Sequence, residues 1–170
     1  DLEGAGEDAF LASAFAAARV TGYRRGGLAT SVKHFVGYGA PEGGRDYTGT
    51  EISVPELMDR YLPPFKAALK AGSETVMASF NTINGVPVTM NRTLVTDLLK
   101  KRLQFDGFVT SDFVAIGELV NHGVARDLEE ASVLAFRAGI DCGMASGGYG
   151  LYLAKAVREG RIRIADVDEA

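Results

Sequence analysis

Several polar side chains follow apolar segments of this sequence, at places where burial should be costly. Lys33 and His34 end the β-branched and aromatic run 30–36, and Asp112 follows "GFVT" and a serine. A carboxylate surrounded by Lys33, His34 and Arg45 would be held ionised by opposite charge. Ionised carboxylates can act as nucleophiles in covalent catalysis. Asp112 is therefore a candidate nucleophile.

The residues alone leave other roles open for each of these side chains. Asp112 precedes "FVAIGEL", so it could equally be the N-cap of a helix, a position that Asp favours. Lys33 and His34 could be ordinary polar residues at a strand end. Adjacent strand residues point to opposite faces, so both reach one ligand only where the strand ends or twists. Arg45 is either a surface residue or a guanidinium fork for sugar hydroxyls or a carboxylate.

Three further polar or reactive residues have structural interpretations. His122, in "NHG", is interpreted as a surface residue or a helix C-cap. Asp141 is interpreted as a structural hydrogen-bonding residue at the end of an apolar segment. Cys142 is the single cysteine of the chain, which excludes an internal disulfide framework, and its apolar context predicts a buried structural thiol.

Composition and absent motifs narrow the class of protein. The 170 residues are 46% hydrophobic and 24% charged, as expected for one soluble globular domain. A net charge of −4 predicts no nucleic-acid partner, and no apolar run approaches the roughly 20 residues of a membrane span. No HExxH or paired-histidine spacing predicts a metal site. The segment "GYGAPEGG" opens no helix as a cofactor phosphate loop would, GxSxG is absent, and no cofactor is expected.

Helical and apolar segments alternate along the chain and must position these side chains. Helices are predicted at 7–24, 55–71, 92–105, 127–138 and 150–158, and strands at 29–36, 75–80, 107–113 and 139–144. The strands are apolar throughout rather than alternating, which indicates a parallel sheet covered by helices, an α/β fold. Such folds carry their chemistry at the carboxyl ends of the strands, where Lys33, His34 and Asp112 lie.

Five segments together resemble glycoside hydrolase family 3, especially its bacterial periplasmic β-glucosidases. They are "VKHFVGYGAPEGGRDY", "YLPPFKAALKAG", "VMASFNTINGVPVTMN", "GFVTSDF" and "AGIDCGM". The resemblance implies a retaining hydrolase that removes terminal non-reducing β-D-glucosyl residues through a covalent glycosyl-enzyme. It implies that Asp112 is the nucleophile, that Lys33 and His34 bind hydroxyls of the sugar, and that Arg45 binds the same sugar.

Two aromatic positions depart from the family pattern. The aromatic residue before Asn in the family's "S-Y-N" segment is Phe80 here, so it lines the pocket without a tyrosine hydroxyl. The aromatic residue after the nucleophile is often Trp and is Phe113 here, so the resemblance implies that Phe113 contacts the substrate and leaves the aglycone preference open. The N-acetylglucosaminidase branch carries "KHFPGHG", whereas this chain reads "KHFVGYG", which argues against that branch.

The resemblance also implies that 1–170 is a partial (β/α) barrel, the second half of a TIM-type catalytic domain within a longer chain. Earlier strands would precede Asp1, and a following domain beyond Ala170 would supply the acid/base glutamate. Glu42 is the nearest candidate acid/base within the chain and is not a convincing one. The expected partners are a β-glucoside or oligosaccharide, the rest of the barrel and that domain, with no membrane or nucleic acid. The expected location is periplasmic or secreted.

Two rival functions remain at this point. The chain could be a non-catalytic half-barrel fragment that lacks the acid/base. It could instead be a barrel lyase or aldolase that uses Lys33 to form a Schiff base, which would require a neutral amine that neighbouring carboxylates oppose.

Overall fold

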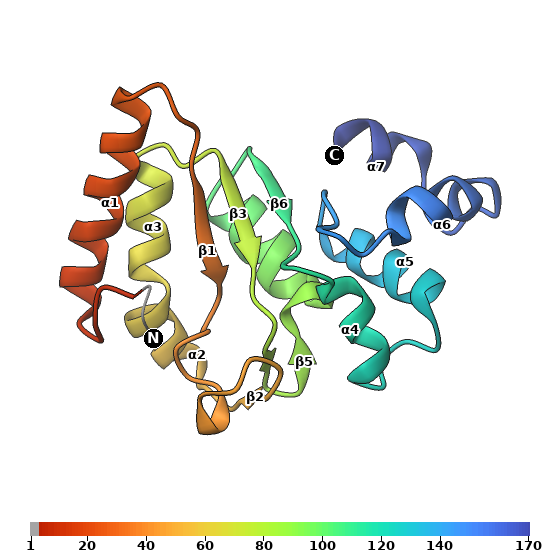
Figure 1. Ribbon diagram of the computed structural model, residues 1–170, viewed down its shortest axis with the longest axis horizontal. Helices are drawn as coiled ribbons and strands as arrows, with labels where there is room; N and C mark the ends of the chain where they lie inside the picture. The colour runs from red at the N-terminus through yellow and green to blue at the C-terminus, as the bar shows by residue number, and fades with distance from the viewer. Residues whose placement is uncertain (1–3) are drawn as a thin grey trace.

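A parallel sheet of three strands, in the order β1-β3-β6, forms the centre of the computed structural model, which describes residues 4–170 (Figure 1). The strands are β1 (Ser31–Phe35), β3 (Thr75–Ala78) and β6 (Phe108–Thr110). Register places Val32 opposite Val76 and Val76 opposite Val109, so apolar side chains meet across the sheet. The predicted α/β class with parallel strands is confirmed.

Helices connect the strands and lie on both sides of them (Figure 1). The α-helices are α1 (Ala9–Arg25), α2 (Val54–Glu56), α3 (Pro63–Lys70), α4 (Ala115–Asn121), α5 (Leu128–Ala138), α6 (Gly148–Arg158) and α7 (Ile164–Glu169). The shorter or wider helices are η1 (Glu42–Gly44), η2 (Leu57–Tyr61), η3 (Val88–Met90) and η4 (Thr93–Arg102), of which η2 and η4 are π-helices. Helix α7 was not predicted from the sequence. No helix within 4–170 has the length and apolar character needed to cross a membrane.

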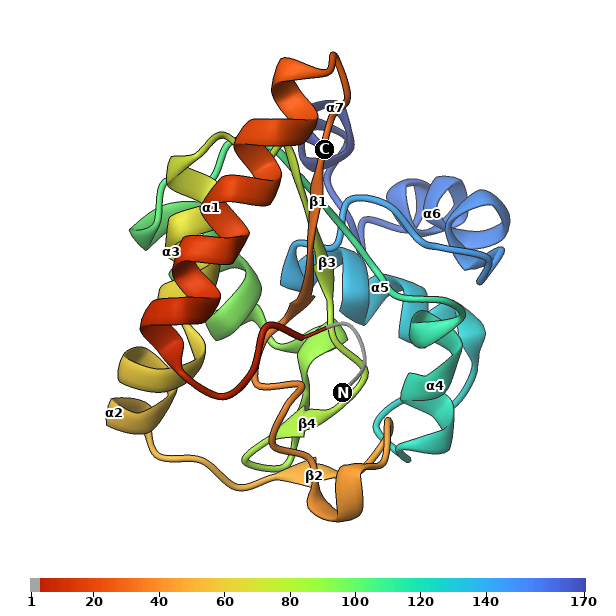
Figure 2. The same ribbon diagram turned by 60° about the vertical axis from the view of Figure 1, so that its left-hand side comes forward.

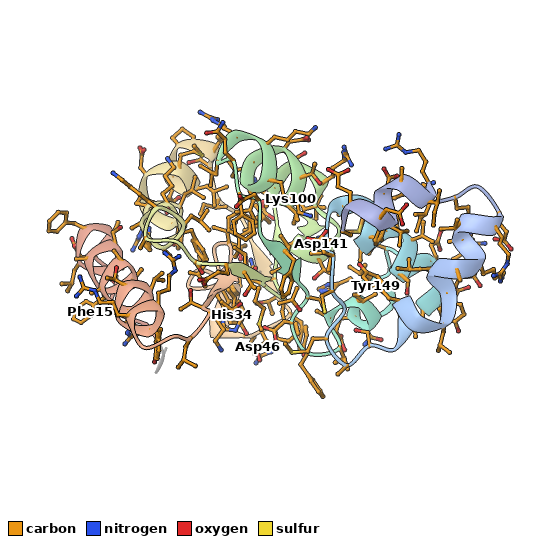
Figure 3. All side chains as sticks on the ribbon, turned by 90° about the horizontal axis from the view of Figure 1, so that it is seen from above. Phe15, His34, Asp46, Lys100, Asp141 and Tyr149 are labelled. Atoms are coloured by element: carbon orange, nitrogen blue, oxygen red, sulfur yellow. The ribbon has the colours of Figure 1, made fainter. Side chains whose placement is uncertain are left out.

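Helix α1 begins where the side chain of Asp8 accepts a hydrogen bond from the backbone N–H of Leu11 at 2.6 Å. It packs beside α3 (Figures 1 and 2). Its apolar spacing does not produce a buried face, because Val20 is its one buried residue and Phe10 is 84% exposed. Figure 3 shows Phe15 at the outer edge of this helix. The apolar outer surface of α1 is therefore uncovered among the described residues.

The helix predicted over 55–71 is divided into three pieces. The backbone N–H of Leu62 donates to the carbonyl of Leu57, which widens this turn into the π-helix η2. Pro63 and Pro64 follow and begin α3. Proline has no N–H to donate, and it fits the first turn of a helix but not its interior. The two prolines therefore explain why one predicted helix is interrupted.

A second small sheet lies beyond the carboxyl ends of β1 and β3 and was not predicted (Figures 1 and 2). It consists of β2 (Gly49–Thr50), β4 (Thr82–Ile83) and β5 (Val86–Pro87). Asn84 and Gly85 form the turn between β4 and β5 with φ values of 49° and 81°. Asn-Gly between apolar residues favours a two-residue hairpin turn, so the signal was present in the sequence.

The fourth strand predicted at 139–144 is wrong as a regular strand. This segment makes one parallel bridge, between Thr110 and Cys142. The backbone N–H groups of Asp141 and Cys142 both donate to the carbonyl of Val109, at 2.8 and 3.1 Å, so a regular ladder cannot continue. The prediction of a buried Cys142 is also wrong, because its residue is exposed. In the described part of the chain, no strand pairs with the outer side of this segment.

The main hydrophobic core lies between the sheet and its helices. Phe35, Val76 and Val109 contribute from the three strands and are fully buried. A smaller cluster formed by Val133, Phe136, Ala156 and Ile162 holds α6 against α5. Core packing thus fixes the three strands, while their carboxyl ends, which carry the candidate site, reach the surface.

Candidate active site

A pocket of about 430 Å³ opens at the carboxyl ends of β1, β3 and β6. Strand ends, the loop after β1 and the region around α3 all contribute to it. Its lining residues are Gly4, Lys33, His34, Gly37, Tyr38, Gly39, Tyr61, Phe65, Phe80 and Asp112. The pocket therefore lies at the end of the sheet where the sequence predicted it.

Asp112 lies two residues beyond β6 and is 8% exposed. Its Oδ1 accepts a hydrogen bond from the backbone N–H of Phe113 at 2.7 Å. Its Oδ2 lies 3.3 Å from His34 Nε2, a distance that suits an ion pair with protonated histidine, although the geometry is not that of a hydrogen bond. Both oxygens are thus placed by the protein, and the carboxylate belongs to the pocket.

The N-cap interpretation of Asp112 is wrong. Helix α4 begins after Val114, whose φ of 52° is left-handed, and no side chain caps it. The turn is instead held from the segment after α5. The hydroxyl of Ser111 donates to the Asp112 carbonyl at 2.9 Å and accepts from the N–H of Met144 at 2.9 Å. The N–H of Val114 donates to the Met144 carbonyl at 2.9 Å. The Asp112 side chain is therefore free of a capping role.

Lys33 and His34 lie next to each other at the end of β1, and both line the pocket. The peptide bond between them is cis. Lys33 is exposed and His34 is partly buried. The structure thus brings both predicted side chains to one ligand-sized space, together with Asp112 from a strand two positions along the sheet.

A loop after β1 closes one side of the pocket. Gly37 has a φ of 76°, and a Cβ there would meet Ile83 Cδ1 at 2.9 Å, so glycine is required by both conformation and space. The Tyr38 ring packs on the His34 ring with centroids 4.7 Å apart, and its hydroxyl donates to the Asp46 carboxylate. Burial, the Asp46 contact and the nearby Asp112 charge hold the pKa of Tyr38 well above its usual range.

An aromatic surface continues from this loop. Phe80 lines the pocket, and the rings of Tyr38 and Tyr47 lie 6.3 and 4.8 Å from it between centroids. Burial, followed by the charges of nearby carboxylates, raises the pKa of Tyr47. Three lining aromatic residues, Tyr38, Tyr61 and Phe65, were not predicted. Tyr38 lies in a glycine-rich segment outside the predicted helices and strands, and the other two lie within the helix predicted over 55–71.

Three sequence candidates do not line the pocket. Phe113 is 60% exposed and contributes its backbone N–H to Asp112 rather than its ring to the pocket wall. Arg45 is exposed in the loop after η1. Glu42 is exposed in η1, with its carbonyl accepting from the Thr48 hydroxyl. Of the lining residues that the structure describes, Asp112 is the one carboxylate.

Asp141 and His122 have the structural roles that were predicted. Lys100 Nζ contacts both carboxylate oxygens of Asp141, at 2.5 and 2.6 Å, and the N–H of Val109 donates to Oδ2 at 2.8 Å (Figure 3). His122 ends α4 as its C-cap. Across 4–170, no group of three or more His, Cys, Asp or Glu side chains is arranged to hold a metal ion.

Enzymes with an α/β fold place their active sites in pockets at the carboxyl ends of the parallel strands, as is the case here. The buried carboxylate in this pocket is the type of group that glycoside hydrolysis requires. The chain belongs to glycosyl hydrolase family 3, because the family's N-terminal domain matches residues 2–170.

Named relatives and solved structures agree with this family. The chain is 40% identical to a periplasmic beta-glucosidase of Salmonella typhimurium over 174 residues, covering 99% of this chain and 23% of the relative. It is 38% identical to a beta-xylosidase of Formosa agariphila, covering 85% and 21%. The crystal structure of a beta-glucosidase from Listeria innocua in complex with glucose superposes with a TM-score of 0.95 at 39% identity, covering 98% and 24%. The chain thus spans about a quarter of these relatives' length.

Proposed function

We propose that the full-length protein is a retaining, exo-acting β-glucosidase that hydrolyses terminal non-reducing β-D-glucosyl residues, with Asp112 as its nucleophile. The observation that carries the proposal is the placement of the Asp112 carboxylate. It is almost fully buried in a ligand-sized pocket, 3.3 Å from His34 Nε2, and shares that pocket with Lys33. The kinship with proteins named beta-glucosidase supports the choice of substrate.

In the proposed mechanism, an Asp112 oxygen attacks the anomeric carbon while the bond to the leaving oxygen breaks. A second carboxyl, about 5–5.5 Å from the first in retaining enzymes, gives its proton to that oxygen. It later takes a proton from water, which attacks the anomeric carbon and releases Asp112. Lys33 and His34 bind sugar hydroxyls and hold the ring for in-line attack. Among the described lining residues no second carboxylate is present, so the acid/base comes from elsewhere in the protein.

We propose that 1–170 is one segment of a (β/α)-barrel catalytic domain and that the rest of the barrel and a following domain complete the active site. The relatives' greater length supports this arrangement, as does the edge of β1 that no strand within 4–170 pairs with. The name of the Salmonella relative supports a periplasmic or secreted location. We propose that Arg45 turns toward the pocket and contacts the sugar, and that Phe113 contacts the leaving group outside the pocket.

A xyloside is the competing substrate, because relatives named beta-xylosidase also match. Chromogenic β-glucoside and β-xyloside, compared by kcat/KM on the full-length protein, decide between them. Activity of the polypeptide 1–170 by itself on either substrate would exclude the non-catalytic half-barrel. Borohydride trapping with a carbonyl substrate tests the lyase alternative, since it would fix a Schiff base on Lys33.

Covalent labelling tests the nucleophile directly. A 2-deoxy-2-fluoro-β-glucoside with a good leaving group should label Asp112, because fluorine slows turnover of the glycosyl-enzyme. Asp112→Asn keeps an acceptor for the Phe113 N–H but removes the nucleophile, so it should stay folded and lose several orders of magnitude in rate. Asp97→Asn, on the exposed surface of η4, is the matched control. A label on another carboxylate, or an active Asp112→Asn protein, would refute the assignment.

A further inference from the structure

Tyr38 joins the pocket to a loop that lies outside the pocket lining. Its ring packs on His34 at 4.7 Å between centroids, tilted by 55°, and its hydroxyl donates to the carboxylate of Asp46. The ring also faces Phe80 at 6.3 Å. Figure 3 shows His34 and Asp46 on the same part of the molecule. One side chain thus contacts both the end of β1 and the loop after η1.

Internal hydrogen bonds connect the two ends of the loop 42–48. A contact that positions Asp46 therefore positions the whole loop. The Thr48 hydroxyl lies 2.9 Å from the carbonyl oxygens of both Glu42 and Arg45 and can donate its single hydrogen to either. The backbone N–H of Thr48 also donates to the Arg45 carbonyl at 3.4 Å. Asp46 is the next residue after Arg45. The Tyr38 contact therefore ties this internally bonded loop to the pocket wall.

The chemistry of the contacts that Tyr38 makes with Asp46 and His34 favours a stable arrangement. A phenol that donates to a carboxylate makes a charge-assisted hydrogen bond, stronger than a neutral one. Burial and the neighbouring carboxylates raise the pKa of Tyr38, so its hydroxyl keeps the proton that it donates across neutral and mildly alkaline pH. Aromatic pairs at this centroid distance are also stabilising. The contact with Tyr38 thus favours the observed orientation of the His34 imidazole beside Asp112.

We propose that Tyr38 is a positioning residue: it sets the orientation of His34 through its ring and the position of loop 42–48 through its hydroxyl. The inference rests on the proposed function, because it makes the alignment of sugar and nucleophile depend on a residue outside the sugar-binding set. A tyrosine that merely fills space predicts something different. It would need its ring but not its hydroxyl, and its replacement would alter stability without altering the rate of each folded molecule.

The test is a mutant cycle in the full-length protein, with active sites counted by the fluoroglucoside so that unfolded molecules do not enter the rate. Tyr38→Phe keeps the ring and removes the donor, and should lower kcat/KM about tenfold, the scale of a lost hydrogen bond to a charged group. Asp46→Ala should lower it by a similar factor. The double variant should be no slower than either single one, because both remove the same bond.

Three further variants separate the role of the Tyr38 ring from that of its hydroxyl and supply a control. Asp46→Asn retains an acceptor oxygen and should recover most of the loss seen in Asp46→Ala. Tyr38→Ala also frees the His34 ring and should be slower than Tyr38→Phe. Tyr23→Phe, in α1 and outside the pocket lining, is the matched control for removing a phenol hydroxyl. The rate of covalent labelling should fall by the same factors as kcat/KM.

The outcomes separate this inference from the proposed function. If wild type is labelled and active while Tyr38→Phe keeps its kcat/KM within twofold, the positioning role is overturned and the β-glucosidase proposal stands. Losses that multiply in the double variant would likewise overturn it, since the two residues would then act independently. If wild type is neither labelled nor active, the proposed function falls and the inference falls with it.

Discussion

Replacing Asp141 by Ala should destabilise this domain more than the loss of any exposed ion pair, although the residue lies outside the pocket. Its side chain is 8% exposed and has two kinds of partner. Lys100 Nζ contacts both oxygens, and the buried Val109 N–H donates to Oδ2. The substitution therefore removes an ion pair and an acceptor for a backbone donor of β6 at once.

The magnitude follows from the burial of each partner. A buried donor left without an acceptor costs about 1–3 kcal/mol. A fully buried ion pair broken on one side costs about 3–5 kcal/mol, but the Lys100 side chain is 26% exposed and can reach solvent, so its share is smaller. We expect a total loss of about 2–4 kcal/mol in the free energy of unfolding of the domain. Asp141→Asn retains an acceptor for Val109 and should lose less.

Thermal and urea unfolding of the full-length protein, followed by a probe in this domain, measure the effect. Asp97→Ala is the matched control, because Asp97 pairs with Lys101 on the exposed side of η4 and should change stability little. The double variant with Lys100→Met should show strong coupling between the two residues. If Asp141→Ala is no more destabilising than Asp97→Ala, the contacts of Asp141 with Val109 and Lys100 do not stabilise the domain as expected.

Three other predictions follow from the site, the backbone and the surface. Lys33→Ala and His34→Ala should each lower kcat/KM by a factor equivalent to about 2–4 kcal/mol, and values within threefold of wild type for both would show that this strand end does not bind the sugar. Gly139→Ala should destabilise by about 1–3 kcal/mol, since φ is 103° and a Cβ would lie 2.6 Å from Thr96 Oγ1, whereas Gly150→Ala in α6 meets open space and should be neutral or stabilising in the same unfolding assay. The polypeptide 1–170 on its own should self-associate, because β1 has one unpaired edge within 4–170 and α1 exposes apolar residues, and a monodisperse monomer in sedimentation would contradict this.

The sequence predicted the sheet and the centre of the site because both depend on local signals. Apolar runs that begin at or shortly after a glycine marked the strands. The rule that parallel strands carry chemistry at their carboxyl ends brought Lys33, His34 and Asp112 together. The structural role of Asp141 was also predictable, since an acidic residue at a buried segment must find partners. These predictions needed no knowledge of how distant loops fold.

Predictions failed where a residue's surroundings depend on other segments. Cys142 is apolar in sequence context but lies where no described strand covers it, so its context did not predict its burial. Phe113 is not among the residues that line the pocket, and its backbone N–H donates to Asp112, so its contact with the substrate stays a proposal. The regular strand at 139–144 failed because two successive N–H groups share the Val109 carbonyl, a detail of pairing that apolar composition does not encode.

Tyr38 shows that a side chain within a glycine-rich loop can make specific contacts in the folded protein. The chain turns at these glycines, and Gly37 has a left-handed backbone conformation. A turn, however, sets where the side chain between its glycines points. Here the chain doubles back over eight residues, so that the Tyr38 hydroxyl meets Asp46 while its ring meets His34. Glycine makes the isolated segment flexible. In the folded protein the segment can nevertheless form a fixed side of the pocket, because the side chains between the glycines make the contacts that hold it in place.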